Sequence, residues 1–338
     1  MRKTTAPAFR ILLSFLLLLV AGCGEGSPNT TGTDQSADAA VPQAPALETV
    51  ELNLQLTVGD RIPLRKVVEQ EIDRSFAATG RQPDSSRSRL EMLLALTVED
   101  VNARGARCAV RYDRIQYSRS RGGQQLDYDS ARPPVAIPLE LAAYQGMVGR
   151  GFTFWIGPDH QIERTEGFAN FVNAALANIP PENRSEALLG VEAGAGEDGV
   201  VDFLNDTIGL FPGGVPKATG DTWHHKRRIA RPVPMHIDTL CTLRELTGEL
   251  AVIDLRGDVT PLVSTGVQTV AHEPTHMVVE HGNTVGECIL FRDTGLPKES
   301  RLVQEFDLAF TFVGKPPFKE HRRVTTTIEC YPLVRAAR

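Results

Sequence analysis

The residues best suited to chemistry in this sequence are the two histidines and the glutamate of His272-Glu273-Pro274-Thr275-His276. On an α-helix, histidines four positions apart lie one turn apart on the same face, where they can bind one Zn²⁺ ion. The glutamate between them can then act as general base on a zinc-bound water. A zinc-dependent hydrolase is therefore one function that the sequence allows.

The residues around this motif argue against the helix that it needs. Pro274 lies in its middle, and a proline inside a helix costs roughly 3 kcal/mol. The β-branched pair Val278-Val279 and the turn pair Gly282-Asn283 follow. In a strand, positions i and i+4 face the same side but lie about 13 Å apart, too far to share a metal. We expect a loop leading into a strand, with no catalytic residue, no metal and no cofactor.

A second group of basic residues is His224-His225 followed by Lys226-Arg227-Arg228. It can be interpreted as a metal or anion site, but the alternation favours a strand with a solvated basic face. The sequence contains neither a Gly-x-Ser-x-Gly nucleophile elbow nor a glycine-rich phosphate loop. These observations favour a protein that is not an enzyme.

The N-terminus has the pattern of an export signal. Arg2, Lys3 and Arg10 accompany the apolar run 11–20, which is about half the length of roughly 20 residues that a membrane-spanning helix needs. Residues 1–22 are therefore predicted to be a signal peptide. Residues 23–48 follow and are rich in Gly, Ser, Thr, Pro and Asp, a composition typical of a disordered tether.

The end of this signal, Val20-Ala21-Gly22-Cys23, resembles the lipobox of bacterial lipoproteins. The resemblance implies that lipoprotein-processing enzymes acylate Cys23 and cut the chain before it. Several acyl chains anchor a protein firmly, where a single chain binds only marginally. The residue after the cysteine is Gly24 and not aspartate. By resemblance to the sorting rule of bacterial lipoproteins, this favours the outer membrane. We expect a lipid-anchored protein of the cell envelope that faces the periplasm.

Charge and cysteine content limit the partners further. The 338-residue chain has a formal net charge of −6, and loss of the signal leaves 33 basic and 42 acidic residues, a net charge of −9. An acidic chain without a basic block argues against nucleic acid as a partner. Besides Cys23, four cysteines occur in strand-like contexts, and both buried thiols and disulfides are open to them: Cys108, Cys241, Cys288 and Cys330.

Hydrophobic periodicity predicts an α+β chain of mostly antiparallel β-structure. We expect a β-rich N-terminal half at 49–166, a helical insert at 167–212 and a β-rich C-terminal half at 213–338. The segment 138–148 fits a helix or a strand. Short matches, such as Gly59-Asp60 with Gly220-Asp221, recur in the same order in both halves and predict an internal duplication.

Three segments carry a resemblance that covers most of residues 50–335: Pro181-Glu182-Asn183-Arg184, Leu210-Phe211-Pro212 and Gly220-Asp221-Thr222-Trp223. They resemble an uncharacterised family of exported bacterial lipoproteins, classed as a domain of unknown function. This resemblance implies location and architecture but no activity. Together with the lack of a convincing catalytic motif, it favours a non-enzymatic binding or scaffolding role, in which a concave apolar face holds an amphiphilic ligand.

Overall fold

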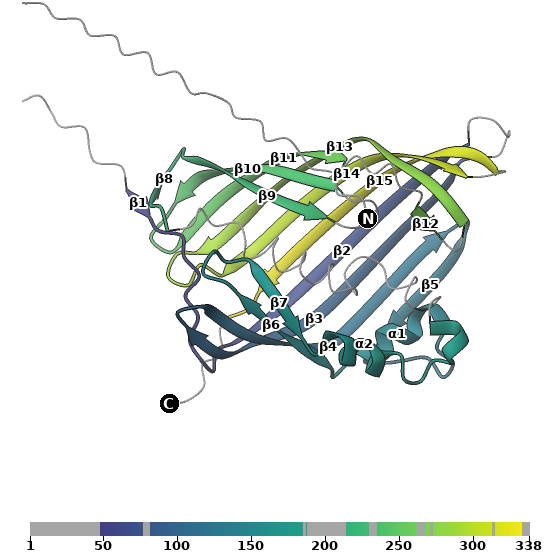
Figure 1. Cartoon of the computed structure of the whole chain (residues 1–338), viewed down its shortest axis with the longest axis horizontal. Coiled ribbons are helices and arrows are strands. Elements are labelled where there is room, and N and C mark those ends of the chain that lie inside the picture. The colour runs from purple at the N-terminus through teal and green to yellow at the C-terminus, as the bar shows by residue number, and fades with distance from the viewer. Residues whose placement is uncertain are drawn as a thin grey trace, which may run out of the picture. The chain divides into compact units, whose positions relative to one another are not determined.

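A computed structural model describes residues 48–76, 82–184, 187, 214–229, 235–261, 268–270, 273–312 and 315–332 (Figure 1). The chain divides into two units, Met1–Ala46 and Leu47–Arg338, and all described residues belong to the second. The predicted signal peptide, the lipobox with Cys23 and nearly all of the tether lie outside the described residues. They remain predictions.

Long strands make up most of the second unit. The strands of its N-terminal part are β1 (Thr49–Val50), β2 (Arg61–Ser75), β3 (Asp84–Asn102), β4 (Gly105–Arg121), β5 (Gln124–Asp129), β6 (Gly151–Ile156) and β7 (Ile162–Glu166). Those of its C-terminal part are β8 (Lys217–Ala218), β9 (Thr222–Ile229), β10 (Met235–Leu246), β11 (Leu250–Pro261), β12 (Gln268–Val270), β13 (Glu273–Phe291), β14 (Pro297–Phe312) and β15 (Lys315–Cys330).

Apart from the pair β1–β8, all these strands form one antiparallel sheet of 13 strands. Its main path is β7-β6-β4-β3-β2-β15-β14-β13-β11-β10-β9. The two β-rich halves predicted from the sequence therefore form one sheet and not two separate ones. The reason is the pairing of β2 with β15, which sets Leu64 opposite Cys330 and joins the two halves along twelve residue pairs. Internal duplication stays a prediction.

The sheet has one apolar and one charged face, as the alternation in the sequence predicts. In β2, Ile62 and Leu64 are buried, while Arg61 is exposed and Arg65 half-buried on the opposite side. Register carries this division from strand to strand: Ile62 pairs with Leu96, and Arg65 pairs with Leu93. We call the two sides the apolar face and the charged face.

Two short helices cover part of the apolar face. Segment 138–148, left open by the sequence, contains helix α1 (Leu139–Met147), and α2 (Phe168–Ala175) lies where the helical insert was predicted. Tyr144 of α1 stacks on Tyr117, and Phe171 of α2 stacks on Tyr112. The 3₁₀ turn η1 (Pro181–Asn183) follows, and residues 185–186 and 188–212 of the predicted insert lie outside the described part.

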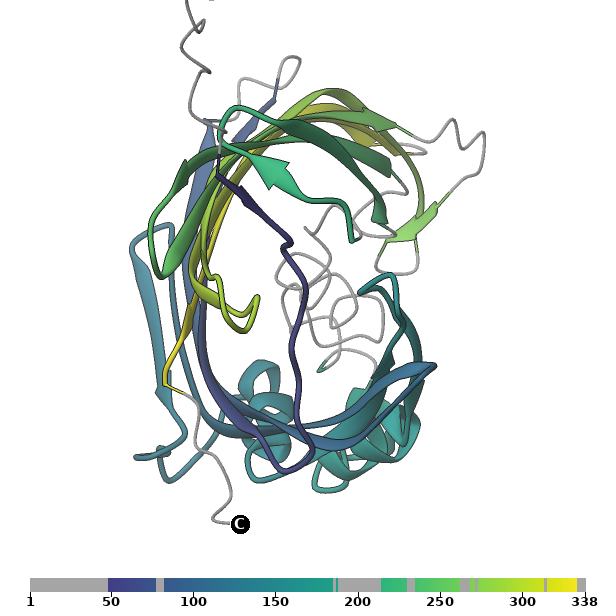
Figure 2. The same ribbon diagram turned by 90° about the vertical axis from the view of Figure 1, so that its left-hand side faces the viewer.

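The sheet curls so that its apolar face is concave (Figure 2). Trp223 of β9 and Phe154 of β6, from near the two ends of the strand order, therefore belong to one core cluster. The segment 51–60, which we call the strap, crosses the sheet at the end where this cluster lies. Leu52 of the strap is buried in the same cluster, and the backbone N–H of Gln55 donates to the carbonyl of Thr294 at 2.8 Å.

Candidate functional site

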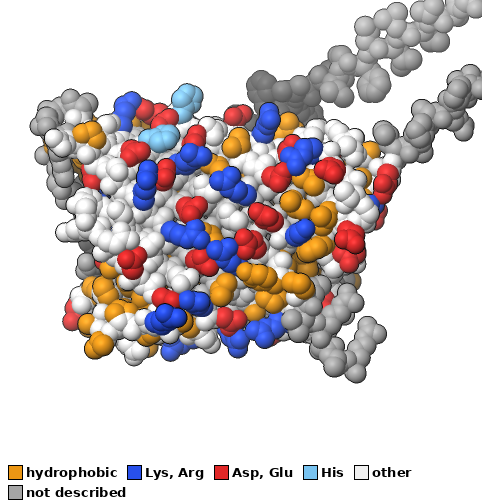
Figure 3. Space-filling model, turned by 180° about the vertical axis from the view of Figure 1, so that it is seen from behind, with side chains coloured by type: hydrophobic (Ala, Val, Ile, Leu, Met, Phe, Trp, Pro, Cys, Tyr) orange, Lys and Arg blue, Asp and Glu red, His pale blue; other side chains and the backbone are white. Residues whose placement is uncertain are grey.

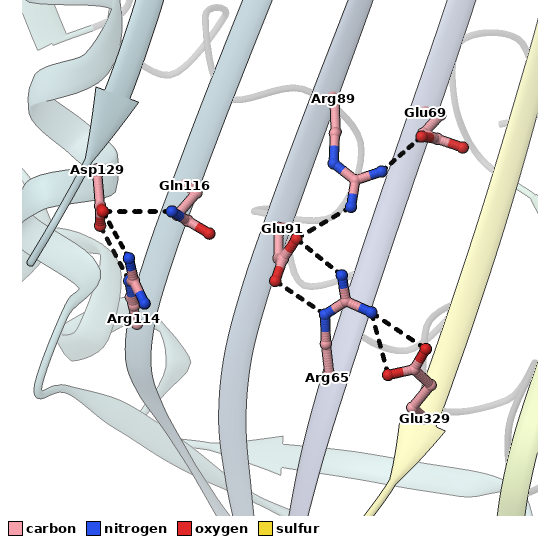
Figure 4. A network of polar contacts seen from close by, with 8 residues as sticks. All are labelled: Arg65, Glu69, Arg89, Glu91, Arg114, Gln116, Asp129 and Glu329. Atoms are coloured by element: carbon pink, nitrogen blue, oxygen red, sulfur yellow. Dashed lines mark hydrogen bonds and ion pairs between the residues drawn. The ribbon is translucent and has the colours of Figure 1, made fainter.

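The charged face is a network of paired side chains (Figures 3 and 4). Arg65 lies between two carboxylates: its Nε is 2.8 Å from Glu91 Oε1, and its Nη1 is 3.0 Å from Glu329 Oε2. The hydrogen bond from Arg65 lowers the pKa of Glu91. Arg114 likewise bonds Asp129 and holds the pKa of that carboxyl at about 2. Such pairs occur on neighbouring strands, so they keep this face polar and charge-balanced.

Two open hollows, of about 510 and 370 Å³, lie on the charged face. Arg89 lines both of them. In the larger hollow, Glu91 accepts from Arg65 and Arg89, and Asp129 accepts from Arg114 and from the side-chain amide of Gln116. These carboxylates are stabilised in their charged form by their partners, which makes them poor general bases.

The apolar face carries two separate clusters of buried hydrophobic side chains. The first, the strap-end cluster, lies where the strap crosses and includes Leu64, Cys241 and Ile253. The second lies toward the other ends of β10, β11, β13 and β14, and we call it the far cluster. Its buried members are Met235, Ile237, Val259, Val279, Phe306, Leu308 and Phe310.

A row of polar positions separates these clusters, and strand register reveals it. On β10, Thr239 lies between Ile237 of the far cluster and Cys241 of the strap-end cluster. On β14, Gln304 has the corresponding place between Phe306 and Leu302. Pairing connects the positions into a continuous line that we call the polar belt, in which all but a glycine and a valine have polar side chains: His225, Thr239, Gly257, Thr284, Gln304, Val324, Gln70, Ser88 and Arg119.

The centre of the polar belt contains two polar atoms that have no hydrogen-bond partner among the described residues. Thr284 is only 1 % exposed, and it is paired across the sheet with Gln304. Neither Thr284 Oγ1 nor Gln304 Nε2 has a hydrogen-bond partner among the described residues, although both atoms are buried. Burying a polar group without a hydrogen bond costs roughly 1–3 kcal/mol, so such a pair marks a place where a partner is needed.

The candidate zinc motif does not form the helix that zinc binding by this pattern requires. Residues 273–276 belong to strand β13, where Glu273 pairs with Val270 and His276 pairs with Thr311. The expected strand is confirmed, but it begins earlier than expected, because residues 273–275 of the predicted loop are already part of β13. His272 lies outside the described part. Within the described ranges, no group of three or more His, Cys, Asp or Glu side chains is placed to hold a metal.

The basic run 224–228 forms β9, and its histidines point to opposite faces. His224 lies on the charged face, with its Nδ1 2.7 Å from Asp238 Oδ1. Lys226, also on that face, lies 3.5 Å from the other oxygen of Asp238. His225 is buried in the polar belt. The prediction of an alternating strand is confirmed, and its solvated basic face carries one shared carboxylate.

The cysteines lie on the apolar face as buried free thiols. Cys108, Cys241, Cys288 and Cys330 are at most 9 % exposed. Burial raises the pKa of Cys108, Cys241 and Cys288 to about 12 and that of Cys330 to about 11. The sequence left open whether these four cysteines are free thiols or form disulfides. In the structure they are free thiols, which pack in the core as small hydrophobic groups.

A family model matches residues 106–297, which is more than half of the chain. The family is described as a family of unknown function, DUF6263. The chain belongs to DUF6263. The resemblance to an uncharacterised family is thus confirmed, while lipidation of this DUF6263 chain remains a prediction. The matched residues extend from β4 to the start of β14 and so include the central Thr284 of the polar belt.

Comparison with other proteins adds no activity. No curated protein matches the DUF6263 chain. Among solved structures, one of lipid–protein interactions in lipovitellin matches with 10 % identity and a TM-score of 0.45 over 84 % of this chain, which spans about a quarter (26 %) of that one. Acinetobacter baumannii OccAB4 matches with 10 % identity over 81 % of this chain and 99 % of its own, at a TM-score of 0.22. Pseudomonas aeruginosa OccK5 (OpdH) has the same two coverages, with 6 % identity and a TM-score of 0.24.

Sequence reasoning did not identify the polar belt of the DUF6263 chain. Thr239, Thr284 and Gln304 are ordinary strand residues, and only the register of the four strands β10, β11, β13 and β14 aligns them. A usable signal was present in β10, where Thr239 interrupts an otherwise apolar series on one face. The described helices include none long and apolar enough to cross a membrane.

Proposed function

We propose that this protein is a non-enzymatic binding protein of the bacterial cell envelope that holds an amphiphile on the apolar face of its sheet. One observation carries the proposal: Thr284 Oγ1 and Gln304 Nε2 are buried between two apolar clusters and have no hydrogen-bond partner among the described residues. An amphiphile has the matching chemistry, because its chain can pack on a cluster while its polar group bonds the hydroxyl and the amide.

The contrast between the two faces supports the same role. On the charged face, the polar groups are satisfied by one another, as in the pairs of Arg65 with Glu91 and Glu329. On the apolar face, two polar atoms lack partners among the described residues and lie between two clusters of hydrophobic side chains. A ligand that removes this cost binds more tightly than its apolar contacts alone would provide.

We further propose that the protein is anchored by acyl chains on Cys23 and works next to the outer membrane, facing the periplasm. The support is the lipobox pattern Val20-Ala21-Gly22-Cys23 after an apolar signal. Fractionation of cells that produce the wild type and Cys23→Ser tests this part. We expect the wild type with the outer membrane and the variant in the soluble fraction. Membrane association that is unchanged in Cys23→Ser would contradict the anchor.

Mass spectrometry of organic extracts tests the binding role. Protein purified without detergent should release an amphiphile in an amount comparable to the protein. The double variant Thr284→Val with Gln304→Met should retain about a tenth or less, since each lost bond is worth about 1 kcal/mol. Thr327→Val serves as matched control, because Thr327 pairs with Arg301 on the charged face. An empty wild type, or equal retention in all variants, would overturn the proposal.

Stability of the ligand-free protein gives a second readout. If the Thr284 hydroxyl lacks a partner without ligand, Thr284→Val removes a buried unsatisfied group and leaves the shape nearly unchanged. We expect the free energy of unfolding of extracted, ligand-free protein to stay equal or to rise by about 1 kcal/mol. A loss of more than about 1 kcal/mol would show that the hydroxyl is already bonded within the protein, and would remove the observation on which the proposal stands.

A further inference from the structure

A cluster of charged side chains lies on the apolar face next to the polar belt. Glu320 of β15 is its centre and is only 2 % exposed. Its Oε2 accepts from Arg74 Nε at 2.9 Å, and its Oε1 accepts from Arg322 Nε at 2.9 Å. A buried carboxylate between two guanidinium groups holds both in fixed orientations, since charge-assisted bonds are the stronger class.

The cluster has an excess of positive charge. Arg74 also lies 3.8 Å from Asp84, and Arg121 bonds Asp84 at 2.7 Å. The cluster thus contains three guanidinium groups, those of Arg74, Arg121 and Arg322, and two carboxylates, those of Glu320 and Asp84. One positive charge is not balanced within it. Arg322 bonds Glu320 through Nε and Nη2, and its Nη1 has no acceptor among the described residues.

The position of this charge suits the headgroup of a ligand on the apolar face. Arg322 is two residues from Val324 of the polar belt on the same strand and face, a separation of about 7 Å. Across the sheet it pairs with Phe306 of the far cluster. An apolar surface, neutral donors and an unbalanced guanidinium are therefore adjacent on one face.

We propose that the Arg74–Arg322 cluster binds the oxyanion headgroup of the amphiphile, a carboxylate or a phosphate. This inference rests on the proposed binding function and specifies its ligand class as anionic. Planar guanidinium groups match both kinds of oxyanion in geometry as well as in charge. The hydrocarbon chain of the ligand packs on the far cluster, and its headgroup lies toward Arg322.

Four probes with the same sixteen-carbon chain test the headgroup: a fatty acid, an alkyl phosphate, a fatty alcohol and an alkyl trimethylammonium. Full-length Cys23→Ser protein, extracted to remove bound lipid, is titrated with each below its micelle concentration. We expect the fatty acid, the alkyl phosphate or both to bind about tenfold or more tightly than the alcohol, and the cation to bind weakest. Whichever anion binds better identifies the source of the oxyanion.

Variants of neighbouring residues make the test specific to the cluster. Arg322→Gln should lower affinity for the anions about tenfold and leave affinity for the alcohol unchanged. Arg323→Gln is the matched control, because Arg323 is the next residue on the strand but pairs with Glu305 on the charged face. Arg322→Lys keeps the charge and should keep most of the preference for anions, which covers the case that Arg322→Gln does not fold.

The outcomes separate this inference from the function on which it rests. Equal affinity for anions and alcohol, or equal losses in Arg322→Gln and Arg323→Gln, would overturn the headgroup assignment and leave amphiphile binding standing. Loss of the preference for anions in a folded Arg322→Lys protein would also count against binding of the headgroup by the positive charge at position 322. No binding of any probe would overturn the proposed function itself.

Discussion

Asp60 and Asp221 make the same hydrogen bonds at the starts of two strands far apart in the sequence. Asp60 Oδ2 accepts from the backbone N–H of Thr57 at 3.0 Å, and Asp221 Oδ2 accepts from that of Ala218 at 2.9 Å. Each aspartate also accepts, through its backbone carbonyl, the N–H of the adjacent strand at 2.9 Å. The preceding residues, Gly59 and Gly220, have φ values of 91° and 94°, which favour glycine. The recurring Gly-Asp pair is thus a recurring turn.

Removing these carboxylates should destabilise the protein unequally. Asp60 is 5 % exposed, whereas Asp221 is exposed, so water competes less for the carboxylate of Asp60 than for that of Asp221. We expect Asp60→Ala to lower the free energy of unfolding by ~2 kcal/mol and Asp221→Ala by about 1 kcal/mol. Urea denaturation measures both, and Asp60→Asn, which keeps an acceptor oxygen, is the control. Equal losses in Asp60→Ala and Asp60→Asn would contradict the role of the hydrogen bond.

The four buried thiols should be unreactive in the native protein. At pH 8, a disulfide reagent should label Cys108, Cys241, Cys288 and Cys330 slowly without urea and rapidly in urea, because only the thiolate reacts. Fast labelling of any of them under native conditions would contradict their burial.

The same thiols predict how stability changes at alkaline pH. Their folded pKa values, about 11 to 12, are raised by burial above the unfolded value near 8.5. A group whose pKa is raised on folding stabilises the folded state below its unfolded pKa, and this contribution is lost as pH rises toward the folded pKa. The urea concentration at the midpoint of unfolding should therefore decrease as the pH rises above about 8.5. Substitution of Cys241 by Ala should make that decline shallower.

At acid pH, the paired carboxylates of the charged face should cause a second loss of stability. Arg114 lowers the pKa of Asp129 to about 2, below its unfolded value near 4. This contribution is present above about pH 4 and is lost as pH falls toward 2. Arg114→Gln should make the urea midpoint of unfolding depend less on pH in this range. Arg111→Gln, which removes the exposed pair with Asp113, should not, and the same effect in both would contradict the assignment.

Metal analysis checks the strand at the candidate zinc motif. Because Glu273–His276 is extended in β13, we expect purified protein to contain well below one zinc per chain. Its melting temperature should not change on addition of zinc or of a chelator. One tightly held zinc per chain that is lost in His272→Ala would show that this part of the motif binds metal after all.

The sequence predicted the local structure better than the assembly. Alternation located strands such as β2, and the Gly-Asp pairs located turns, since both depend on residues close in sequence. The sequence left segment 138–148 undecided between helix and strand. The segment that forms α1 has few polar residues, so its pattern does not distinguish the period of a helix from that of a strand. In the structure, Leu141, Tyr144 and Met147 are all buried. Packing on the apolar face settles its conformation.

The single sheet and the polar belt needed information that the sequence does not show locally. Pairing of Leu64 with Cys330 depends on which strands become neighbours, and nothing near either residue specifies it. The belt depends on register as well, because a shift of one residue in β14 would turn Gln304 to the charged face. The unpartnered atoms of Thr284 and Gln304 became visible only once the strands were aligned.

The pairing of β2 with β15 also determines when the protein can finish folding. These strands lie at opposite ends of the chain, and Arg65 and Glu329, which bond across this part of the sheet, are 264 positions apart. Synthesis delivers β2 before β15, so β2 has its partner on one side only after β15 is available. Contacts of such long range slow folding and leave strand edges open to aggregation. Chaperones that shield these edges until β15 has been synthesised would therefore help this chain to fold.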